Sequence, residues 1–168
     1  MKSIKTMSDK ILKVKDAIKL AHRIRSKGKK IVLVGGCFDI LHIGHITFLQ
    51  RAKAEGDVLF VLLEADESIK KIKGKNRPIN NQEDRARILA AIEVVDEVVL
   101  LSINLKDEDY DELIMQLKPA IIATTEGDLK RYQKVRQASL VGAEVIDVIE
   151  VVSDQSTTRL IGLLEKDL

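Results

Sequence analysis

The chain is 168 residues long, which is enough for one domain with a substantial core and short for two. Aromatic residues make up only 3%, without Trp, and the formal charge is +2, so the composition favours neither stacking on single-stranded nucleic acid nor a polyanionic partner. A single cysteine excludes an internal disulfide and a cysteine cluster for metal. The absence of a long apolar run and of a signal-peptide pattern predicts a cytoplasmic chain with no membrane partner.

Short runs rich in Val, Ile and Leu recur along the chain, separated by longer amphipathic stretches. Each run has the length of a β-strand that is buried on both faces. The predicted strands are Ile31–Val34, Val58–Leu63, Glu97–Leu101, Ala120–Thr124 and Glu144–Ile149. Five strands that alternate with helices predict an α/β fold: a Rossmann-like, doubly wound five-stranded parallel sheet with helices on both faces.

The amphipathic stretches predict the helices. Before the first strand, apolar residues recur at spacings of three and four from Ile11 to Ala21, and Gly28 ends this helix. Further helices are expected over Gly44–Glu55, Gln82–Glu93, Asp107–Lys118 and Leu129–Val141, with a last one from about Thr157. Residues 1–28 are thus expected to form a helical extension to a single domain of residues 29–168.

The most informative segment connects the first strand to the next helix, with the sequence Gly-Gly-Cys-Phe-Asp-Ile-Leu-His-Ile-Gly-His over residues 35–45. Two glycines let the backbone turn, and the start of the helix directs N–H groups and the positive end of the helix dipole to one point, which suits an anion. The segment lacks the Gly-Lys-Ser/Thr of a Walker loop and the Gly-x-Gly-x-x-Gly of dinucleotide-binding proteins. In open α/β sheets ligands bind at the carboxyl ends of the strands, where this segment falls.

His42 and His45 flank Gly44 at the expected start of that helix. Two imidazoles can donate hydrogen bonds to phosphate oxygens and offset the charge that develops during displacement at phosphorus, and a glycine allows close approach of the backbone. The alternatives are two surface or capping histidines, or half of a zinc site. Zinc needs three or four ligands, and three His and one Cys in the whole chain do not supply a convincing set. We therefore expect no protein-bound metal cluster.

Residues 35–45 resemble the signature of the HIGH-motif nucleotidyltransferases, the cytidylyltransferase-like family, and the resemblance extends from about Lys29 to Ile161. Members include glycerol-3-phosphate cytidylyltransferase, heptose 1-phosphate adenylyltransferase, archaeal-type FAD synthetase and phosphopantetheine adenylyltransferase. The resemblance implies that His42 and His45 are catalytic and that neighbouring loop residues bind the nucleotide. These neighbours are Gly36, Cys37, Phe38, Asp39 and Gly44. Asp39 either positions a group at the site or braces the loop.

A basic segment follows the second strand, and its Lys73-Gly-Lys75-Asn-Arg77-Pro resembles the Lys-Gly-x-x-Arg-Pro of sugar-phosphate adenylyltransferases. The charge pattern of residues 66–79 by itself predicts a solvated loop. The resemblance implies that Lys75 and Arg77 act in catalysis from a mobile loop over the phosphates, with Lys73 among the nucleotide-binding residues. Arg85 resembles the arginine of the family's Glu-x-Arg element, which supports nucleotide or acceptor binding. The alternative is an exposed helix arginine paired with a carboxylate.

Two later segments also resemble the family. Gly127 and Asp128 match part of a Lys-Gly-Gly-Asp-Tyr element of heptose adenylyltransferases, in which Thr125 replaces the Lys. A Ser-Thr-Thr element resembles the one that opens a helix beside the triphosphate in the family, and a plain helix N-cap is its alternative. It consists of Ser156, Thr157 and Thr158. Glu64 stands where heptose adenylyltransferases usually have Asn, which leaves the acceptor open.

The resemblance implies transfer of a nucleoside monophosphate from an NTP to a phosphorylated acceptor, with Mg²⁺ carried mainly by the triphosphate. The acceptor phosphate is already ionised, so no general base is required and catalysis reduces to alignment and charge neutralisation. ATP with a sugar 1-phosphate such as heptose 1-phosphate is the preferred pair. The alternatives are CTP with glycerol 3-phosphate or another polyol phosphate, ATP with FMN, and a non-enzymatic nucleotide-binding sensor. The family also suggests a homodimer.

Overall fold

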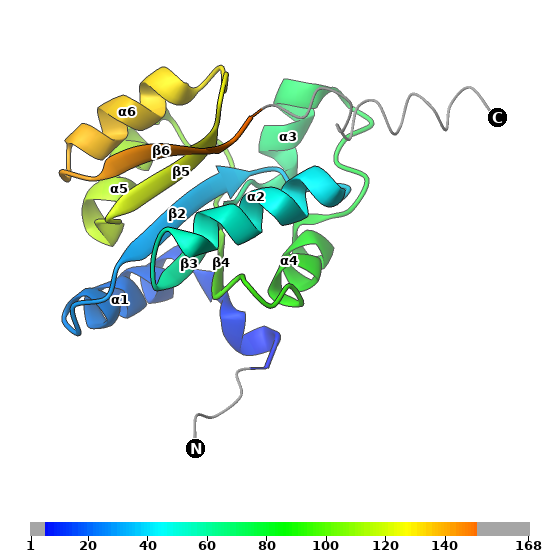
Figure 1. The fold of residues 1–168 in the computed structure, drawn as a ribbon. Coiled ribbons are helices and arrows are strands. Elements are labelled where there is room, and N and C mark those ends of the chain that lie inside the picture. Colours follow the sequence, from blue (N-terminus) through cyan, green and yellow to red (C-terminus); the bar gives the residue numbers. More distant parts are fainter. Residues whose placement is uncertain (1–5, 151–168) are drawn as a thin grey trace.

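The computed structural model describes residues 6–150, which contain one six-stranded sheet (Figure 1). Its strands are parallel and follow the order β1-β4-β3-β2-β5-β6. They are β1 (Ile11–Lys13), β2 (Ile31–Gly36), β3 (Val58–Leu63), β4 (Glu97–Leu100), β5 (Ile121–Thr125) and β6 (Glu144–Ile149). The predicted α/β fold is confirmed, each of the predicted strands is present, and β3 and β6 have the predicted bounds.

The sheet has six strands where the sequence predicted five. The additional strand, β1, has only three residues and pairs with β4 at the sheet edge, with Ile11 opposite Val98. Because Ile11 also matches the helical spacing of the residues after it, the periodicity did not separate this strand from the helix that follows, α1 (Val14–Arg25). Residues 11–25 thus contribute a strand to the sheet and a helix to the layer that covers it.

Helices cover both faces of the sheet (Figure 1). The helices after α1 are α2 (Ile43–Ala54), α3 (Asp66–Lys73), α4 (Gln82–Ala90), α5 (Asp107–Leu117) and α6 (Arg131–Ser139). α2 and α4 pack on one face, where Leu49 and Leu89 are fully buried. α1, α5 and α6 pack on the other, where Ala21 and Leu117 are fully buried. Full burial of a leucine side chain contributes about 1.5–3 kcal/mol, so the two layers jointly stabilise the sheet.

Helix α3 was not expected, because the charged residues 66–79 predicted a solvated loop. Ile69 is fully buried while most of its neighbours in α3 are charged and exposed, and this amphipathic pattern was hidden by the density of charge. Gly74 ends the helix with a φ of +97°, a conformation that favours glycine. Only the residues after Gly74 form a loop. The helix expected from about Thr157 lies outside the described residues.

β2 occupies the point at which the winding of the sheet reverses. It pairs with β3 on one side and with β5 on the other. Ligands of open α/β sheets bind at the carboxyl ends of the strands at such a point. We therefore expect a site at the carboxyl ends of the strands. Three segments follow these ends: the loop after β2, the start of α3 and the turn after β5. None of the helices within residues 6–150 is long and apolar enough to cross a membrane.

Candidate active site

The site begins where β2 ends, in the segment that the sequence singled out. A Cβ on Gly36 would lie 3.0 Å from the ring of Phe38, so a side chain there would press on that ring. Phe38 has a φ of +44°, in the left-handed region, and the chain turns there. His42 then caps α2 in an extended conformation, with φ −138° and ψ 171°. The first N–H groups of α2, which lack partners within the helix, therefore face the carboxyl edge of the sheet.

His42 and His45 stack at the start of α2, with ring centroids 3.9 Å apart. The backbone N–H of His42 donates to Nδ1 of His45 at 3.4 Å, which leaves Nε2 to carry the proton of the neutral imidazole. Burial lowers the pKa of His42. Burial, together with the charges of His42 and Lys73, lowers the pKa of His45 to about 4. At neutral pH both rings are therefore neutral hydrogen-bond donors and not cations.

Asp39 ties the loop after β2 to the loop after α3. Its carboxylate accepts hydrogen bonds from Nε of Arg77 at 2.7 Å and from the backbone N–H groups of Ile79 and Asn80 at 2.9 Å. Burial opposes its ionisation, but these hydrogen bonds and the charge of Arg77 lower the pKa of Asp39 overall. In the structure Asp39 therefore braces the loop. Its carboxylate holds the side chain of Arg77 inside the protein, where Arg77 is 8% exposed, although the sequence predicted an arginine on a mobile loop.

Two buried nitrogens in these connected loops have no hydrogen-bond partner among the described residues. They are Nδ1 of His42 and Nη2 of Arg77. Leaving a buried polar group unsatisfied costs about 1–3 kcal/mol, so folded proteins rarely do so without a reason. Both atoms belong to residues for which the sequence predicted contact with phosphates. Nη2 of Arg77 is a donor, for which a bound anion is a chemically suitable partner. Nδ1 of His42 faces the first turn of α2, where the backbone N–H of His45 points towards the His42 side chain.

Arg85, on α4, fixes the ends of β2 and β3 to the loop before the helix. It is fully buried, and its guanidinium donates to three backbone carbonyl oxygens and one carboxylate. The carbonyl oxygens are those of Cys37, Glu64 and Asn80, at 2.5, 2.8 and 3.0 Å. The carboxylate is that of Asp66, at 2.7 Å. Since each guanidinium nitrogen is used by the protein, Arg85 positions the surrounding loops, and the alternative of an exposed arginine is wrong.

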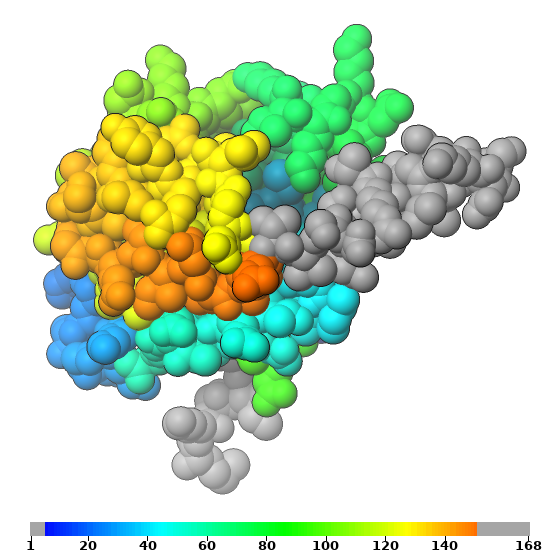
Figure 2. Space-filling view, turned by 45° about the horizontal axis from the view of Figure 1, so that its top comes forward, coloured from blue at the N-terminus to red at the C-terminus, as the bar shows by residue number. Residues whose placement is uncertain are grey.

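A cavity of about 350 Å³ opens beside the carboxyl end of β2, on the face covered by α5 and α6. Figure 2 looks towards this edge, where blue atoms of the β2 region lie recessed between green atoms of the α3 region and yellow atoms after β5. The polar lining includes Cys37, Glu64, Lys73, Asp107, Tyr110, Asp128, Lys130 and Lys134. Burial raises the pKa of the Cys37 thiol, whereas Lys73 lowers it. Because Lys73 also lowers the pKa of His45, its ammonium lies near both the cavity and the histidine pair.

Two polar clusters form part of the cavity wall. The hydroxyl of Tyr110 donates to Oε1 of Glu64 at 2.7 Å, and burial and the charge of Glu64 raise the pKa of Tyr110. Lys134 donates to Oδ2 of Asp128 at 2.6 Å and to Oγ1 of Thr124 at 2.8 Å. Burial opposes ionisation of Asp128, but its hydrogen bonds to Lys134, to Thr124 and to a backbone N–H lower its pKa overall. The ammonium of Lys134 is therefore paired within the wall.

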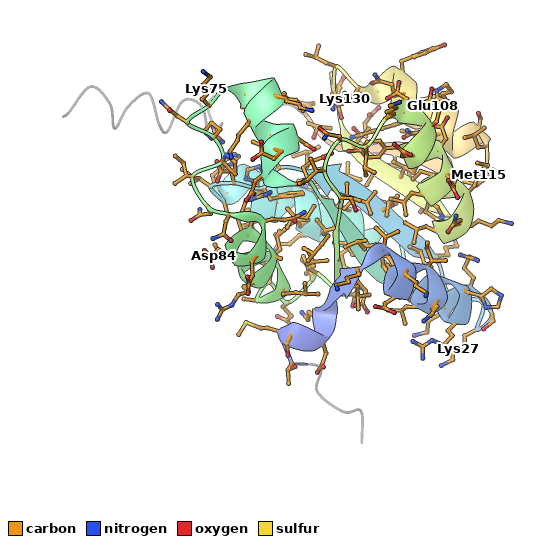
Figure 3. All side chains as sticks on the ribbon, turned by 180° about the vertical axis from the view of Figure 1, so that it is seen from behind. Lys27, Lys75, Asp84, Glu108, Met115 and Lys130 are labelled. Carbon is orange, nitrogen blue, oxygen red and sulfur yellow. The ribbon has the colours of Figure 1, made fainter. Side chains whose placement is uncertain are left out.

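The structure brings most of the predicted site residues to this edge, but not all of them. Lys75 is exposed and lies on the outer surface beyond α3 (Figure 3). Gly127 has a φ of +75° and shapes the turn between β5 and α6. The predicted roles of Ser156, Thr157 and Thr158 lie outside the described residues.

The sequence analysis missed Tyr110 and two lysines of the cavity. Lys130 and Lys134 come shortly after Asp128 and are four residues apart, a spacing that places side chains on one face of a helix. The sequence therefore held a signal for the two lysines. It held none for Tyr110, because its partner Glu64 is 46 residues away along the chain.

Comparison with known proteins places this site in a family. A family model described as Cytidylyltransferase-like matches residues 33–161, a range that contains the histidine pair and the cavity. The chain belongs to the cytidylyltransferase-like family. Membership confirms the family recognised from residues 35–45, and with it the expectation of a nucleotidyltransferase.

Curated relatives cover most of this chain. The Bifunctional protein HldE of Aliarcobacter butzleri is 43% identical over 149 residues, which are 89% of this chain and 30% of that protein. The Bifunctional protein HldE of Sulfurimonas denitrificans is 39% identical over 165 residues, which are 98% of this chain and 33% of that protein. The chain therefore spans about a third of the length of these relatives.

Solved structures share the fold. A lipopolysaccharide core biosynthesis protein from Thermoplasma volcanium matches with a TM-score of 0.57 and 27% identity, over 73% of this chain and 96% of that one. A pantothenate synthetase from Thermus thermophilus matches with a TM-score of 0.55 and 15% identity, over 83% of this chain and 61% of that one. The second likeness concerns the fold alone.

Proposed function

We propose that the chain transfers AMP from ATP to a sugar 1-phosphate of the heptose 1-phosphate type and releases pyrophosphate. The observation that carries this reaction is the neutral histidine pair that stacks at the N-terminus of α2. A helix N-terminus and two imidazole donors at one place suit phosphate oxygens that gain charge. The neighbouring cavity of about 350 Å³ is within the size range of small-molecule sites.

The sugar phosphate acceptor is supported by several independent features. The segments around Arg77 and Ser156 resemble those of heptose 1-phosphate adenylyltransferases. The relatives carry the name Bifunctional protein HldE, and one solved neighbour is described as a lipopolysaccharide core biosynthesis protein. The cavity offers carboxylate and phenol oxygens for sugar hydroxyls and lysines for a phosphate.

In the proposed reaction an oxygen of the acceptor phosphate attacks the α-phosphorus of ATP. An oxygen–phosphorus bond forms, the bond from the α-phosphorus to the bridging oxygen breaks, and pyrophosphate leaves with that electron pair. The acceptor phosphate is ionised at neutral pH, so no side chain has to remove a proton. His42 and His45 donate hydrogen bonds to the oxygens that gain charge. Lys73, near both the rings and the cavity, attracts the phosphates of both substrates.

Asp39 and Arg85 serve this reaction as positioning residues. Arg85 holds the backbone of Cys37 and Glu64, which line the cavity. Asp39 holds Nε of Arg77 and leaves Nη2 of that side chain as an unused donor, for which a phosphate oxygen is a suitable acceptor. Lys75 would contact the phosphates only from the exposed loop after α3.

Magnesium is proposed to enter with the nucleotide. Within residues 6–150 no three His, Cys, Asp or Glu side chains are grouped to hold a metal ion. Mg²⁺ commonly binds through substrate phosphates and water, and it would neutralise charge on the triphosphate. The contact of Ser156–Thr158 with the triphosphate and the formation of a homodimer stay predictions.

Pyrophosphate release tests the proposal. ATP and CTP are each combined with heptose 1-phosphate, other sugar 1-phosphates, glycerol 3-phosphate and FMN. The expected result is the highest kcat/KM for ATP with heptose 1-phosphate. A higher value for CTP with glycerol 3-phosphate, or for ATP with FMN, would replace the proposed substrates and keep the transferase. Nucleotide binding by the folded chain without pyrophosphate release from any pair would contradict the reaction and favour a nucleotide sensor.

A further inference from the structure

Glu64 and Tyr110 meet in the cavity although they come from different elements of the fold. Glu64 follows β3 and Tyr110 lies on α5, and the phenol donates to the carboxylate at 2.7 Å. The main chain of Glu64 is also fixed, because its N–H donates to the carbonyl oxygen of Gly36 at 3.2 Å and its own carbonyl oxygen accepts from Arg85 at 2.8 Å. The carboxylate is therefore held in one place, from the backbone and from Tyr110.

This pair presents hydrogen-bond acceptors to a ligand. A carboxylate offers about four lone-pair positions, of which Tyr110 uses one. Burial and the charge of Glu64 raise the pKa of Tyr110, so the hydroxyl keeps its proton and directs it to Glu64. The remaining positions are oxygen lone pairs. They suit the hydroxyl groups of a ligand and repel an anionic group.

The cavity carries charges of both signs. Lys73 and Lys130 lower the pKa of Cys37 and Glu64 raises it, so all three charges lie near the end of β2. Lys134 is paired with Asp128 at 2.6 Å. On the α5 side, Asp107 and Glu64 both raise the pKa of Tyr110, so two carboxylates lie near that phenol. The position beside Tyr110 therefore faces two carboxylates, which oppose an anion there.

We propose that Glu64, held by Tyr110, makes the cavity select an acceptor with a hydroxyl group at this position against one with a second phosphate there. The inference rests on the proposed function, because it takes the cavity as the acceptor's site. The carboxylate accepts a hydrogen bond from a sugar hydroxyl, and it repels a phosphate placed there. Specificity of this kind depends on an unfavourable contact with the wrong ligand as well as a favourable one with the right ligand.

Binding of a matched pair of ligands tests the inference. Mannose 1-phosphate and mannose 1,6-bisphosphate are titrated by calorimetry into the full chain, with a non-hydrolysable ATP analogue present. We expect the wild type to bind the monophosphate at least about tenfold more tightly than the bisphosphate, and Glu64→Gln to reduce this ratio to about threefold or less. Tyr110→Phe is expected to give an intermediate ratio, because the carboxylate loses its fixed position but keeps its charge.

Glu108→Gln is the matched control. Glu108 is exposed on α5 and lies on the surface in Figure 3, so this variant removes the same charge outside the cavity and is expected to keep the wild-type ratio. An equal affinity of the wild type for both ligands, an unchanged ratio in Glu64→Gln, or no binding of the monophosphate to the wild type would each overturn the inference. Because the measurement is of binding, discrimination without any pyrophosphate release would refute the proposed reaction and leave the inference standing.

Discussion

Two cavities of similar size lie at opposite ends of the strands, one at the carboxyl ends and one at the amino ends. One, of about 350 Å³, lies beside the carboxyl end of β2, and the other, of about 400 Å³, lies at the amino ends of β3 and β4. Figure 3 marks both edges, with Lys130 and Lys75 at one and Lys27 at the other. Both cavities are lined by several lysines and carboxylates. Size and the number of charges therefore do not distinguish them.

The two ends of the strands differ in what lies beside each cavity. At the amino edge, Lys10 donates to the carbonyl oxygen of Val95 at 2.8 Å, and Asp96 accepts from Lys53 at 2.6 Å and from a backbone N–H at 2.7 Å. These contacts tie the strand ends together. At the carboxyl ends, the two histidines stack at the N-terminus of α2, and Nη2 of Arg77 is a buried donor with no hydrogen-bond partner among residues 6–150. A helix N-terminus with two imidazoles, and not the larger volume, locates the site.

The largest expected effect comes from the histidine pair. In His45→Asn the amide oxygen can still accept from the N–H of His42, but the donor at Nε2 is lost. We expect kcat/KM for pyrophosphate release to fall by about 10²–10³. His45→Gln places an N–H nearer the lost one and is expected to recover part of the rate. In Lys27→Met, at the cavity of the amino ends, kcat/KM is expected to stay within about twofold of the wild type. A larger loss of kcat/KM in Lys27→Met than in His45→Asn would place the site at the amino ends instead.

Arg85→Met is expected to lower the free energy of unfolding by about 3 kcal/mol, because it leaves three carbonyl oxygens and the carboxylate of Asp66 without their donor. Arg87→Met, at an exposed position of the same helix, is the control and is expected to change stability by less than about 0.5 kcal/mol. Urea unfolding of both variants measures the difference. Equal free energies of unfolding of the two variants would show that the Arg85 contacts do not hold the ends of β2 and β3 together.

Acidification is expected to destabilise the protein through His45. Its folded pKa of about 4 lies below the ordinary value of 6.5, so between these two pH values the unfolded chain binds more protons and stability falls as pH falls. Between pH 7 and pH 4.5 the free energy of unfolding of the wild type should fall by about 2 kcal/mol more than that of His45→Asn. Asp39, whose pKa is lowered from 3.8, loses its contribution only below this window. Parallel pH profiles for the two proteins would contradict the burial of His45.

Much of the fold could be predicted from local patterns. The β-branched runs predicted five strands because central parallel strands are apolar on both faces. In β2, for example, Val32 is buried on one face of the sheet and Leu33 on the other. β1 was missed because its only neighbour in the sheet is β4, and three residues do not show a period. α3 was missed because a single buried residue, Ile69, marks its inner face. Tertiary contacts decide both elements, and the sequence does not show those contacts.

The site was predictable where one continuous segment forms it. Residues 35–45 contain the turn, the helix start and both histidines, so their chemistry could be recognised from the sequence. The partners of Asp39 and Arg85 could not, because they come from other loops that meet only after folding. For the same reason the sequence did not predict that Glu64 would be held by Tyr110.

The central claim is that a nucleoside triphosphate binds at His42 and His45, and NMR of the imidazole nitrogens tests it most directly. The chain has three histidines, and the third, His22, is exposed on α1 next to Arg23, which lines the amino-edge cavity. On titration with Mg²⁺ and a non-hydrolysable ATP analogue, we expect the resonances of His42 and His45 to shift and the pKa values of these two residues to rise, whereas the resonances of His22 do not shift. Shifts confined to His22, or saturating nucleotide binding that moves neither His42 nor His45, would contradict it.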